Sequence, residues 1–551
     1  MHKVKAASLY FHTLRHLRAR QFIARARMKL TRPRASDAPA PALAVWLHPW
    51  QAPVWKRQSL FAPDCFVFLA QAHTLHQASD WDNPAWPQLW RYNLHYFDDL
   101  DSTGAAERRP LQLAWMRRWV EQNPPRSGTA WDPYPTSLRV VNWVKFCSGT
   151  GLAAAGILDS LAQQTRWLRQ RLEYHLLANH LLVNAKALIF AGAFFSGPEA
   201  ARWLGQGLAI LGPQLQEQFL ADGGHFELSP MYHAALLWDV LELIQLARCS
   251  GQPLLLQHQT AWQEVATRAL RWLQLMCHSD AEISFFNDAA LGIAPPLSAV
   301  LAFAGQLGIS TVAPPLAAPG QPPRLTRLQA SGYARVDWSD ALLLADVGPV
   351  GPDYQPGHAH ADTLSFELSV AGQRVIVNCG TSQYGVGPER QAQRSTAAHS
   401  TLEVDGENSS EVWAGFRVAR RARPLGYKAR QRADGVEIQC AHDGYTRLPG
   451  QPQHQRIWQA TAGNLRIVDT VTGPHCRAVA YFHLHPAVAL GREGHVLLLQ
   501  LPGEKTLRFE VQTGEIEIHR SSWHPGFGEA VDTHCIAVTA QQGQCACLLN
   551  W

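Results

Sequence analysis

The sequence contains no run of apolar residues approaching the roughly 18 that a membrane-spanning helix needs. Its beginning also lacks the apolar stretch of about 7–15 residues that is typical of a secretory signal peptide. The ten cysteines are scattered and form no CxxC pair, which indicates reduced, mostly buried thiols rather than a disulfide framework. These absences argue against a helical membrane protein. They lead us to expect a cytoplasmic location, with the periplasm or a membrane surface as alternatives.

Acidic residues are absent from residues 1–34, which carry ten lysines and arginines. Removing these ten from the 49 basic residues of the chain leaves 39 basic against 44 acidic residues. The body is therefore slightly acidic although the whole chain has a formal net charge of +5. This division argues against a protein that binds nucleic acid over its whole surface.

The basic arm, residues 1–40, has apolar residues interleaved with its charges, as an amphipathic helix would. These are Leu9, Phe11, Leu14, Leu17, Phe22 and Ile23. The pattern leaves two alternatives open. The arm either makes peripheral contact with an anionic membrane surface or packs on the body of the protein.

The length of 551 residues predicts more than one domain. Apolar residues recur at three- and four-residue spacing through residues 41–312, which predicts successive antiparallel helices in a bundle, a solenoid or a closed toroid. "APPLAAPGQPPR", residues 313–324, cannot continue a helix and indicates a linker. From 325 to 551 the period becomes two, which predicts an antiparallel β-sandwich. The expected fold is thus a multidomain chain, helical first and then β.

The stretch "GHAHADTLSFEL", residues 357–368, is the most distinctive candidate for chemistry. His358, His360 and Asp362 share the parity of Leu364 and Phe366, so we expect them to extend one face of a strand. Asn378 ends "RVIVNC", a strand expected to pair with 363–370. Two histidines on one strand face, joined by a third from another strand, would form a metal site. The ordinary alternative is that they are core or surface histidines.

Two helical segments also carry clustered polar residues. "LANHLLVNAKAL" holds Asn179 and His180, which would otherwise be capping or satisfied polar side chains. In "DGGHFELSPMYH", Ser229 is a good N-cap and is followed by a proline, which sets Tyr232 and His233 in the first turn of a helix. The alternative for Tyr232 is a structural anchor.

Twenty tryptophans are a high number, and several of them lie among polar residues. Trp131, in "AWDPYPTSLRVVNW", is an example. Aromatic faces stack on sugar rings, so an aromatic cleft would suit a polysaccharide. Packing between large helices is the competing explanation.

Seven segments together resemble a known family. They are "YNLHYFDDL", "WDPYPTSLRVVNW", "NHLLVNAKAL", "DGGHFELSPMYH", "GHAHADTLSFEL", "VNCGTSQYG" and "RSTAAHSTLEVDGENSSEVWAGF". In this order they resemble the heparinase II/III-like polysaccharide lyases, which pair an (α/α) toroid or incomplete barrel with a β-sandwich. The resemblance covers nearly the whole chain. It is strongest to members associated with bacterial exopolysaccharide biosynthesis.

The resemblance implies β-elimination on a uronic acid, in which a base removes the C5 proton and the 4-O-glycosidic bond breaks. The neighbouring carboxylate must be neutralised, because its charge opposes a carbanion. Asn179, His180 and His358 match the family's neutralising groups. Tyr232 matches the catalytic tyrosine, which would act as base and then as acid. Tyr384, in "GTSQYG", falls near a second tyrosine of related lyases.

We expect an anionic polysaccharide or oligosaccharide as the partner, with no organic cofactor. The acidic body argues against a heavily sulfated chain, since such chains usually require basic clefts. The residues expected to contact the substrate are Trp131, Tyr134, Arg139, His225, Glu227 and His233.

The resemblance also implies a bound zinc. His360 and His399 match two of the family's ligands, and Asn378 stands where the family usually has aspartate. An amide oxygen is a poor zinc ligand, so this departure weakens the predicted site. Without metal, the same cluster would brace the domain junction.

Three other functions remain open from sequence. A glycoside hydrolase needs two carboxylates beside the bond, and Glu227 and Asp222 are the nearest candidates. A uronate C5-epimerase would share the proton abstraction and return the proton to C5. A non-catalytic protein would bind polysaccharide within an exopolysaccharide assembly system.

Overall fold

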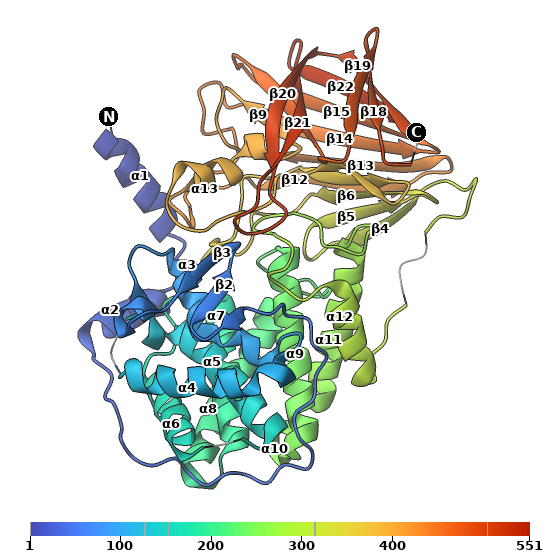
Figure 1. The fold of residues 1–551 in the computed structure, drawn as a ribbon. Coiled ribbons are helices and arrows are strands. Elements are labelled where there is room, and N and C mark those ends of the chain that lie inside the picture. The colour runs from blue at the N-terminus through green and yellow to red at the C-terminus, as the bar shows by residue number, and fades with distance from the viewer. Residues whose placement is uncertain (1, 126–127, 153, 313–315, 504) are drawn as a thin grey trace.

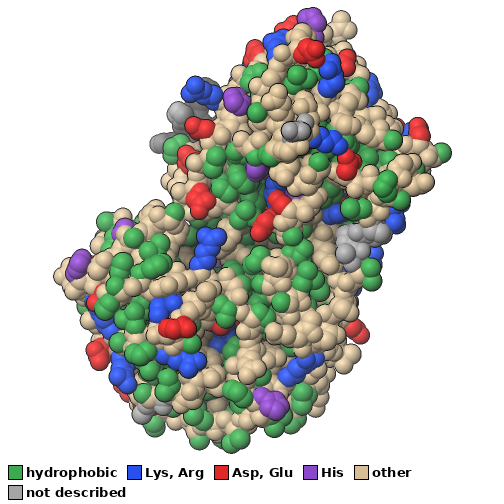
Figure 2. Space-filling view, turned by 45° about the vertical axis from the view of Figure 1, so that its right-hand side comes forward, with side chains coloured by type: hydrophobic (Ala, Val, Ile, Leu, Met, Phe, Trp, Pro, Cys, Tyr) green, Lys and Arg blue, Asp and Glu red, His purple; other side chains and the backbone are tan. Residues whose placement is uncertain are grey.

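The computed structural model describes residues 2–125, 128–152, 154–312, 316–503 and 505–551. Figure 1 shows two lobes, with helices in the first part of the chain and sheets in the second. The predicted fold class, helical first and then antiparallel β, is confirmed. Figure 2 shows the outline narrowing where the lobes meet, with charged side chains of both signs spread over that face.

The helical lobe is built around one helix that is buried almost on every side. This helix, α7 (Ala178–Phe194), contacts α5, α6, α8 and α9. Its sequence is mostly apolar, as a central helix requires, and its polar residues Asn179, Asn184 and Lys186 are buried as well. The other helices of the lobe are α3 (Gln88–Tyr96), α4 (Arg109–Gln122), α5 (Pro133–Thr150), α6 (Ala155–Gln170), α8 (Gly197–Gln218), α9 (Pro230–Ser250), α10 (Pro253–Leu256), α11 (Gln259–Met276) and α12 (Leu297–Gln306).

Glycines let α7 and α8 approach closely. A Cβ atom built on Gly192 of α7 would lie 2.5 Å from the backbone nitrogen of Leu204 in α8. A Cβ on Gly207 of α8 would lie 2.8 Å from the carbonyl oxygen of Ala185. Since backbone atoms cannot yield as a flexible side chain can, these two positions exclude any larger residue at this spacing.

The β lobe contains two large antiparallel sheets. One has the order β12-β13-β14-β15-β22-β19-β18-β17, and the other β20-β21-β16-β8-β7-β6-β5-β4 with β9 beside β16. The bounds are β4 (Arg324–Leu328), β5 (Tyr333–Asp337), β6 (Ala341–Asp346), β7 (Phe366–Val370), β8 (Gln373–Val377), β9 (Leu402–Val404), β12 (Pro424–Gln431), β13 (Gly435–His442), β14 (Gln453–Thr461), β15 (Asn464–Thr472), β16 (Ala478–Leu484), β17 (Ala489–Glu493), β18 (Val496–Gln500), β19 (Thr506–Thr513), β20 (Glu515–Trp523), β21 (Val531–Thr539) and β22 (Gln544–Asn550).

The second of these sheets is covered on both faces. Leu343 of β6 belongs to the core between the sheets, whereas its neighbours Leu342 and Leu344 pack on Trp272 and other residues of the helical lobe. This explains why every residue of β6 is buried instead of every second one. The lobes are therefore joined by a continuous apolar contact as well as by the chain.

Three details differ from the sequence predictions. A small sheet, β1 (Leu60–Ala62), β2 (Cys65–Phe68) and β3 (Gln71–Thr74), lies within the region predicted to be helical. The strand predicted from residue 363 begins only at Phe366, because Leu364 has a φ of +64°. His358, His360 and Asp362 consequently lie on a loop and not on a strand face. Of the predicted linker, residues 313–315 lie outside the described residues.

The basic arm forms two helices, α1 (His2–Leu14) and α2 (Ala19–Leu30), which run beside the junction of the lobes in Figure 1. Tyr10 packs edge-on against Trp413 with ring centroids 4.9 Å apart. Arg18 lies over the ring of Tyr354 at 3.6 Å. The arm thus packs on the body in part. In the part of the chain that the structure describes, no helix is both long and apolar enough to span a membrane.

The contact between α7 and α8 predicts opposite effects for two glycine substitutions. Gly192→Ala should destabilise the protein by about 1–3 kcal/mol, because the new methyl group meets backbone atoms. Gly205→Ala, in α8, should be neutral or stabilising, because a Cβ added there would meet no other atom within 4 Å. Thermal unfolding of both variants measures this; equal stabilities would contradict the close packing.

Candidate active site

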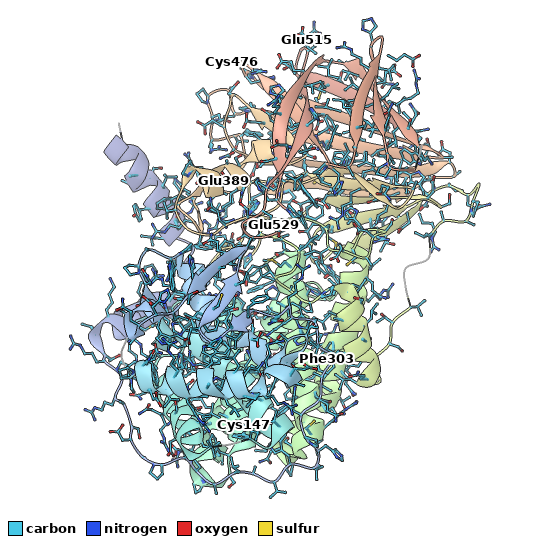
Figure 3. All side chains as sticks on the ribbon, in the orientation of Figure 1. Cys147, Phe303, Glu389, Cys476, Glu515 and Glu529 are labelled. Carbon is cyan, nitrogen blue, oxygen red and sulfur yellow. The ribbon has the colours of Figure 1, made fainter. Side chains whose placement is uncertain are left out.

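The site lies where four irregular segments meet the first turns of α7 and α9. Two segments come from the β lobe, the loop 357–365 and the loop that follows β8. The others are the segment between α11 and α12, which carries Asp288, and the turn at Glu227 before α9. Figure 3 shows side chains of both lobes filling this junction, where Glu389 and Glu529 also lie.

Tyr232 is positioned by the start of α9. The Ser229 side chain caps the helix by accepting a hydrogen bond from the Tyr232 N–H at 3.2 Å. The Tyr232 hydroxyl lies 2.9 Å from that of Tyr384, and its ring stacks on His358 with centroids 3.7 Å apart. Both tyrosines are half-buried, and Phe416 beside Tyr384 is 43% exposed. The structure therefore brings two phenols and an imidazole together near the surface.

Asp288 holds these groups in place, although its side chain is fully buried. Its carboxylate accepts hydrogen bonds from His358 Nδ1 at 3.0 Å and from His360 Nε2 at 2.8 Å. Arg390 forms an ion pair with both oxygens, one of them at 2.7 Å. Thr381 adds a further bond at 3.2 Å. These partners come from three segments of the β lobe.

The electrostatic balance keeps Asp288 charged. Burial alone would raise the pKa of its carboxyl group, but Arg390 and the bonds from the two histidines hold that pKa well below its usual value. The backbone adds to the connection. The Asp288 N–H donates to the carbonyl of His358 at 3.0 Å, and its carbonyl accepts from the Ser229 hydroxyl at 2.5 Å. One residue thus links the cap of α9 to the histidine loop.

The first turn of α7 supplies two more of the predicted residues. Asn179 is buried, and its amide oxygen has no hydrogen-bond partner among the described residues. His180 Nδ1 lies 3.1 Å from Glu173. Burial would lower the pKa of His180, but Glu173 outweighs it and raises that pKa above its usual value. A protonated imidazole at a helix N-terminus attracts an anion.

Glu227 faces the same groups from the turn before α9. It is 2% exposed, and its carboxylate lies 3.8 Å from His358 Nε2. Neither oxygen forms a hydrogen bond with another described side chain. Burial raises the pKa of Glu227, and His358 and His180 oppose this only in part. A protonated carboxyl group here would be a hydrogen-bond donor.

Four residues expected to contact substrate lie in the interior instead. Trp131 is 4% exposed and packs between other tryptophans, with its indole N–H bonded to the carbonyl of Asn123. Arg139 is fully buried and donates to the carbonyl groups of His95 and Ala130. These two predictions are wrong, because the side chains that the sequence suggested for sugar binding are packed in the interior of the helical lobe.

The predicted substrate contacts of His225 and His233 are wrong for the same reason. Both are fully buried, His225 against Gln218 at 3.0 Å and His233 against the carbonyl of Ala269 at 2.9 Å. They stabilise the turn before α9 and do not face the site. Tyr134, in contrast, lies beside the site, with its ring 4.7 Å from that of His180.

The predicted zinc ligands are only partly assembled. His360 Nδ1 and His399 Nε2 are 3.1 Å apart, and burial lowers the pKa of both imidazoles, to about 4 and about 3. Asn378 does not complete the set, because its amide oxygen accepts from the Ser400 N–H at 3.1 Å. Within the described residues, no three His, Cys, Asp or Glu side chains could hold a metal together. The donors present do not fit zinc, and we derive no chemical step through a metal.

Sequence reasoning missed Asp288, Arg390 and Glu173. All three are buried. Asp288 contacts His358, Glu173 contacts His180, and Arg390 contacts Asp288. A signal was present for Asp288, since "SFFNDAALG" places it inside an otherwise apolar stretch. A carboxylate there must either be exposed or find partners.

Comparison with known proteins decides the family. The model of the heparinase II/III N-terminus matches residues 76–295, and that of the heparinase II/III-like C-terminal domain matches residues 320–551. The chain belongs to the heparinase II/III-like family. The family predicted from the seven segments is confirmed.

Two curated relatives illustrate the range of this family. The chain is 28% identical over 450 residues to FtsZ-localized protein C of Caulobacter vibrioides, covering 74% of this chain and 72% of that one. It is 27% identical over 260 residues to a heparin-sulfate lyase of Bacteroides stercoris. That match covers 43% of this chain and only 37% of the lyase.

Solved structures share the fold across both lobes. A heparinase III structure is similar with a TM-score of 0.65 and 15% identity, over 84% of this chain and 76% of that one. A heparan sulfate lyase HepC mutant from Pedobacter heparinus gives a TM-score of 0.58 and 17% identity, over 96% and 87%. At this identity the likeness concerns the fold alone.

The Asp288 cluster predicts a large effect for an isosteric change. Asp288→Asn should lower the free energy of unfolding by about 3–5 kcal/mol, because Arg390 is left buried without a counter-charge. The matched control is Asp340→Asn, which removes an exposed ion pair with Lys505 and should cost at most about 1 kcal/mol. Similar losses in urea-induced unfolding of the two variants would contradict the assigned role.

The incomplete ligand set predicts the metal content. Protein expressed with added zinc should retain less than about 0.1 equivalent after dialysis, and Asn378→Asp should raise zinc affinity by restoring a carboxylate. Elemental analysis of both proteins measures this. Stoichiometric zinc in the unmodified protein would show that the two histidines suffice with a donor that we have not identified.

Proposed function

We propose that this protein is a polysaccharide lyase that cleaves a uronic-acid-containing polysaccharide by β-elimination. The observation that carries the proposal is the cluster of Tyr232, Tyr384 and His358, together with buried Asn179 in the first turn of α7, whose amide oxygen has no hydrogen-bond partner among the described residues. Membership of the family and similarity to heparin-sulfate lyases support it. The acidic body favours a sparsely sulfated substrate, such as a bacterial exopolysaccharide.

The substrate carboxylate would bind at the first turn of α7. Asn179 offers an amide, His180 carries a raised pKa, and His358 completes the set from the β lobe. Two helix N-termini, those of α7 and α9, start at this point and add positive potential. Together these groups would offset the negative charge that makes the C5 proton hard to remove.

The proton would pass through Tyr232. Burial raises the pKa of Tyr232 well above its usual value, with Tyr384 and Tyr134 adding to the effect. The free protein therefore holds this phenol protonated. Arg390 lies 5.0 Å from the Tyr384 ring, but its charge is largely balanced by Asp288. We infer that the phenolate forms only as the pH rises or as substrate binding brings new positive contacts.

The step balances without water. Tyr232, as phenolate, takes the C5 proton, and the electrons of the C5–H bond form the C4–C5 double bond as the C4–O bond breaks. The leaving oxygen then takes the proton from Tyr232, which restores the phenolate. Tyr384, 2.9 Å away, is placed to relay a proton to or from Tyr232.

The geometry favours this reaction over hydrolysis. Both carboxylate oxygens of Asp222 are already used, Oδ1 by the Gly224 N–H and Oδ2 by Ser331. Asp222 thus supports the lobe junction and is not free to pair with Glu227 in hydrolysis. A uronate C5-epimerase would use the same groups, and only its products distinguish it.

The second candidate is a non-catalytic polysaccharide-binding protein. The match to FtsZ-localized protein C spans more of the chain than the match to the Bacteroides stercoris lyase. In that case the chain would bind uronate polysaccharides without releasing an unsaturated product. A screen of such polysaccharides, read out by binding and by the ultraviolet absorbance of an unsaturated uronate, separates the two functions.

Tyr232→Phe tests the catalytic assignment. Removing the hydroxyl should reduce turnover by at least about 10³-fold while leaving substrate affinity within a few-fold, since the proton transfer is lost. Tyr445→Phe is the control, because it removes a buried phenolic hydrogen bond to Leu402 in the β lobe. Full turnover by Tyr232→Phe on a validated substrate would overturn the assignment.

Glu227→Gln tests the state of the buried carboxyl group. If protonated Glu227 donates to the substrate carboxylate, activity falls as the pH rises through its elevated pKa, and the amide variant loses that fall while keeping activity at low pH. The control Glu227→Ala lacks the donor and should be slow at every pH. An inactive Glu227→Gln with an intact fold would mean that the carboxylate itself is needed, as in hydrolysis.

A further inference from the structure

The outward side of α2 is unusually apolar for a solvent-exposed helix. Phe22, Ile23 and Leu30 are 45%, 69% and 84% exposed, and Ala26 is exposed between them. At 100° per residue these four positions fall within an arc of about 100° on one side of the helix. They form a continuous stripe, which we call the α2 stripe.

The opposite side of α2 fixes the direction of the stripe. Gln21 is 1% exposed and donates to the carbonyl of Tyr354 at 3.3 Å. Ala24 and Met28, which follow Gln21 on the same side, are partly buried. Because this side is held on the body, the α2 stripe faces away from the body.

Basic side chains border the α2 stripe on both sides. By the same helical angles, Arg20 and Arg27 lie along one edge, and Arg25 and Lys29 lie along the other. All four residues lie at the surface, and residues 1–34 contain no acid. The combination is an apolar strip between two basic edges.

The preceding helix repeats the pattern. In α1, Tyr10, Phe11 and Leu14 are 46%, 64% and 39% exposed, and Ala7 lies on the same side. The spacing i, i+3, i+4 and i+7 places them on one side of the helix. Both helices of the arm therefore expose aromatic and aliphatic groups, although Tyr10 also packs on Trp413 of the body.

From this geometry we propose that the arm binds the surface of an anionic phospholipid bilayer. The apolar stripe would enter the boundary between headgroups and acyl chains, and the arginines and lysines on its edges would pair with lipid phosphates. This binding does not depend on whether the candidate active site is catalytic.

Two other occupants match the surface less well. A polyanionic sugar chain would satisfy the basic edges but offers no apolar partner for Phe22, Ile23 and Leu30. A second copy of the same helix would cover the stripes, but it would bring basic edges against basic edges. Of these three occupants, only a bilayer with acidic headgroups complements both features at once.

Binding would also place the candidate active site beside the bilayer. The arm rests on Tyr354, whose ring lies 6.1 Å from that of Phe226, the residue before Glu227. A lipid-bound arm would thus hold the junction of the lobes close to the membrane surface.

Vesicle co-sedimentation of the full chain tests the proposal. The protein should bind vesicles of phosphatidylcholine with phosphatidylglycerol and not vesicles of phosphatidylcholine alone. Binding should weaken as salt is raised, because the phosphate contacts are screened. Phe22→Ser with Ile23→Ser should weaken it by at least about tenfold through lost apolar burial. Arg25→Gln, Arg27→Gln and Lys29→Gln together should weaken it by about 100-fold.

A matched control comes from α10. Leu254 and Leu256 are 45% and 44% exposed, so their joint change to serine removes a similar apolar area without basic neighbours in that helix. This variant should bind vesicles like the unmodified protein. Circular dichroism and thermal unfolding verify that all variants fold.

Several results would overturn the proposal. These are no binding to anionic vesicles, binding that the α2 variants leave unchanged, or equal loss in the α10 control. The proposal would also fail if the arm bound a uronate polysaccharide but not vesicles. It would fail too if the protein formed dimers that the substitutions in the α2 stripe convert to monomers.

Discussion

The arrangement of the site depends on one buried negative charge. Burying a carboxylate away from water is costly unless other groups replace its hydration. At Asp288 these groups are Arg390, two imidazoles and a hydroxyl group. Each of these groups must keep its position for the charge to stay compensated. The requirement fixes His358 against Tyr232 and orients the loop that follows β8. The geometry that we assign to catalysis is therefore a consequence of charge burial.

The two lobes contribute different parts of the chemistry. The helical lobe supplies rigid first turns, with Asn179, His180 and Tyr232 held by helices whose interiors are packed. The β lobe supplies His358 and Tyr384 on loops that hydrogen bonds tie to Asp288 and its neighbours. Buried ion pairs often add little stability over an apolar core, so their value here lies in specifying one arrangement of the loops.

The sequence predicted the order of the domains well, because hydrophobic period is a local property. Strands such as β13 and β14 follow the alternation closely, with buried residues alternating with exposed or partly exposed ones. The β1–β3 meander was not predicted, because its strands are too short to establish a hydrophobic period.

The site was predicted less completely. Tyr232 could be placed from its capping sequence. The parity argument for His358 and His360 was wrong, because Leu364 adopts a left-handed conformation and the strand begins only after it, at Phe366. Trp131 and Arg139 were misassigned, since composition cannot tell an aromatic core from an aromatic surface. Asp288 and Arg390 lie 102 residues apart, and only the folded chain brings them together.

The products formed in water labelled with the heavy oxygen isotope test the central claim most directly. For a uronate polysaccharide that the protein cleaves, elimination predicts fragments that contain no label and a new unsaturated end on one of them. Incorporation of one labelled oxygen at each cleaved bond, with no unsaturated sugar, would show hydrolysis and contradict the account.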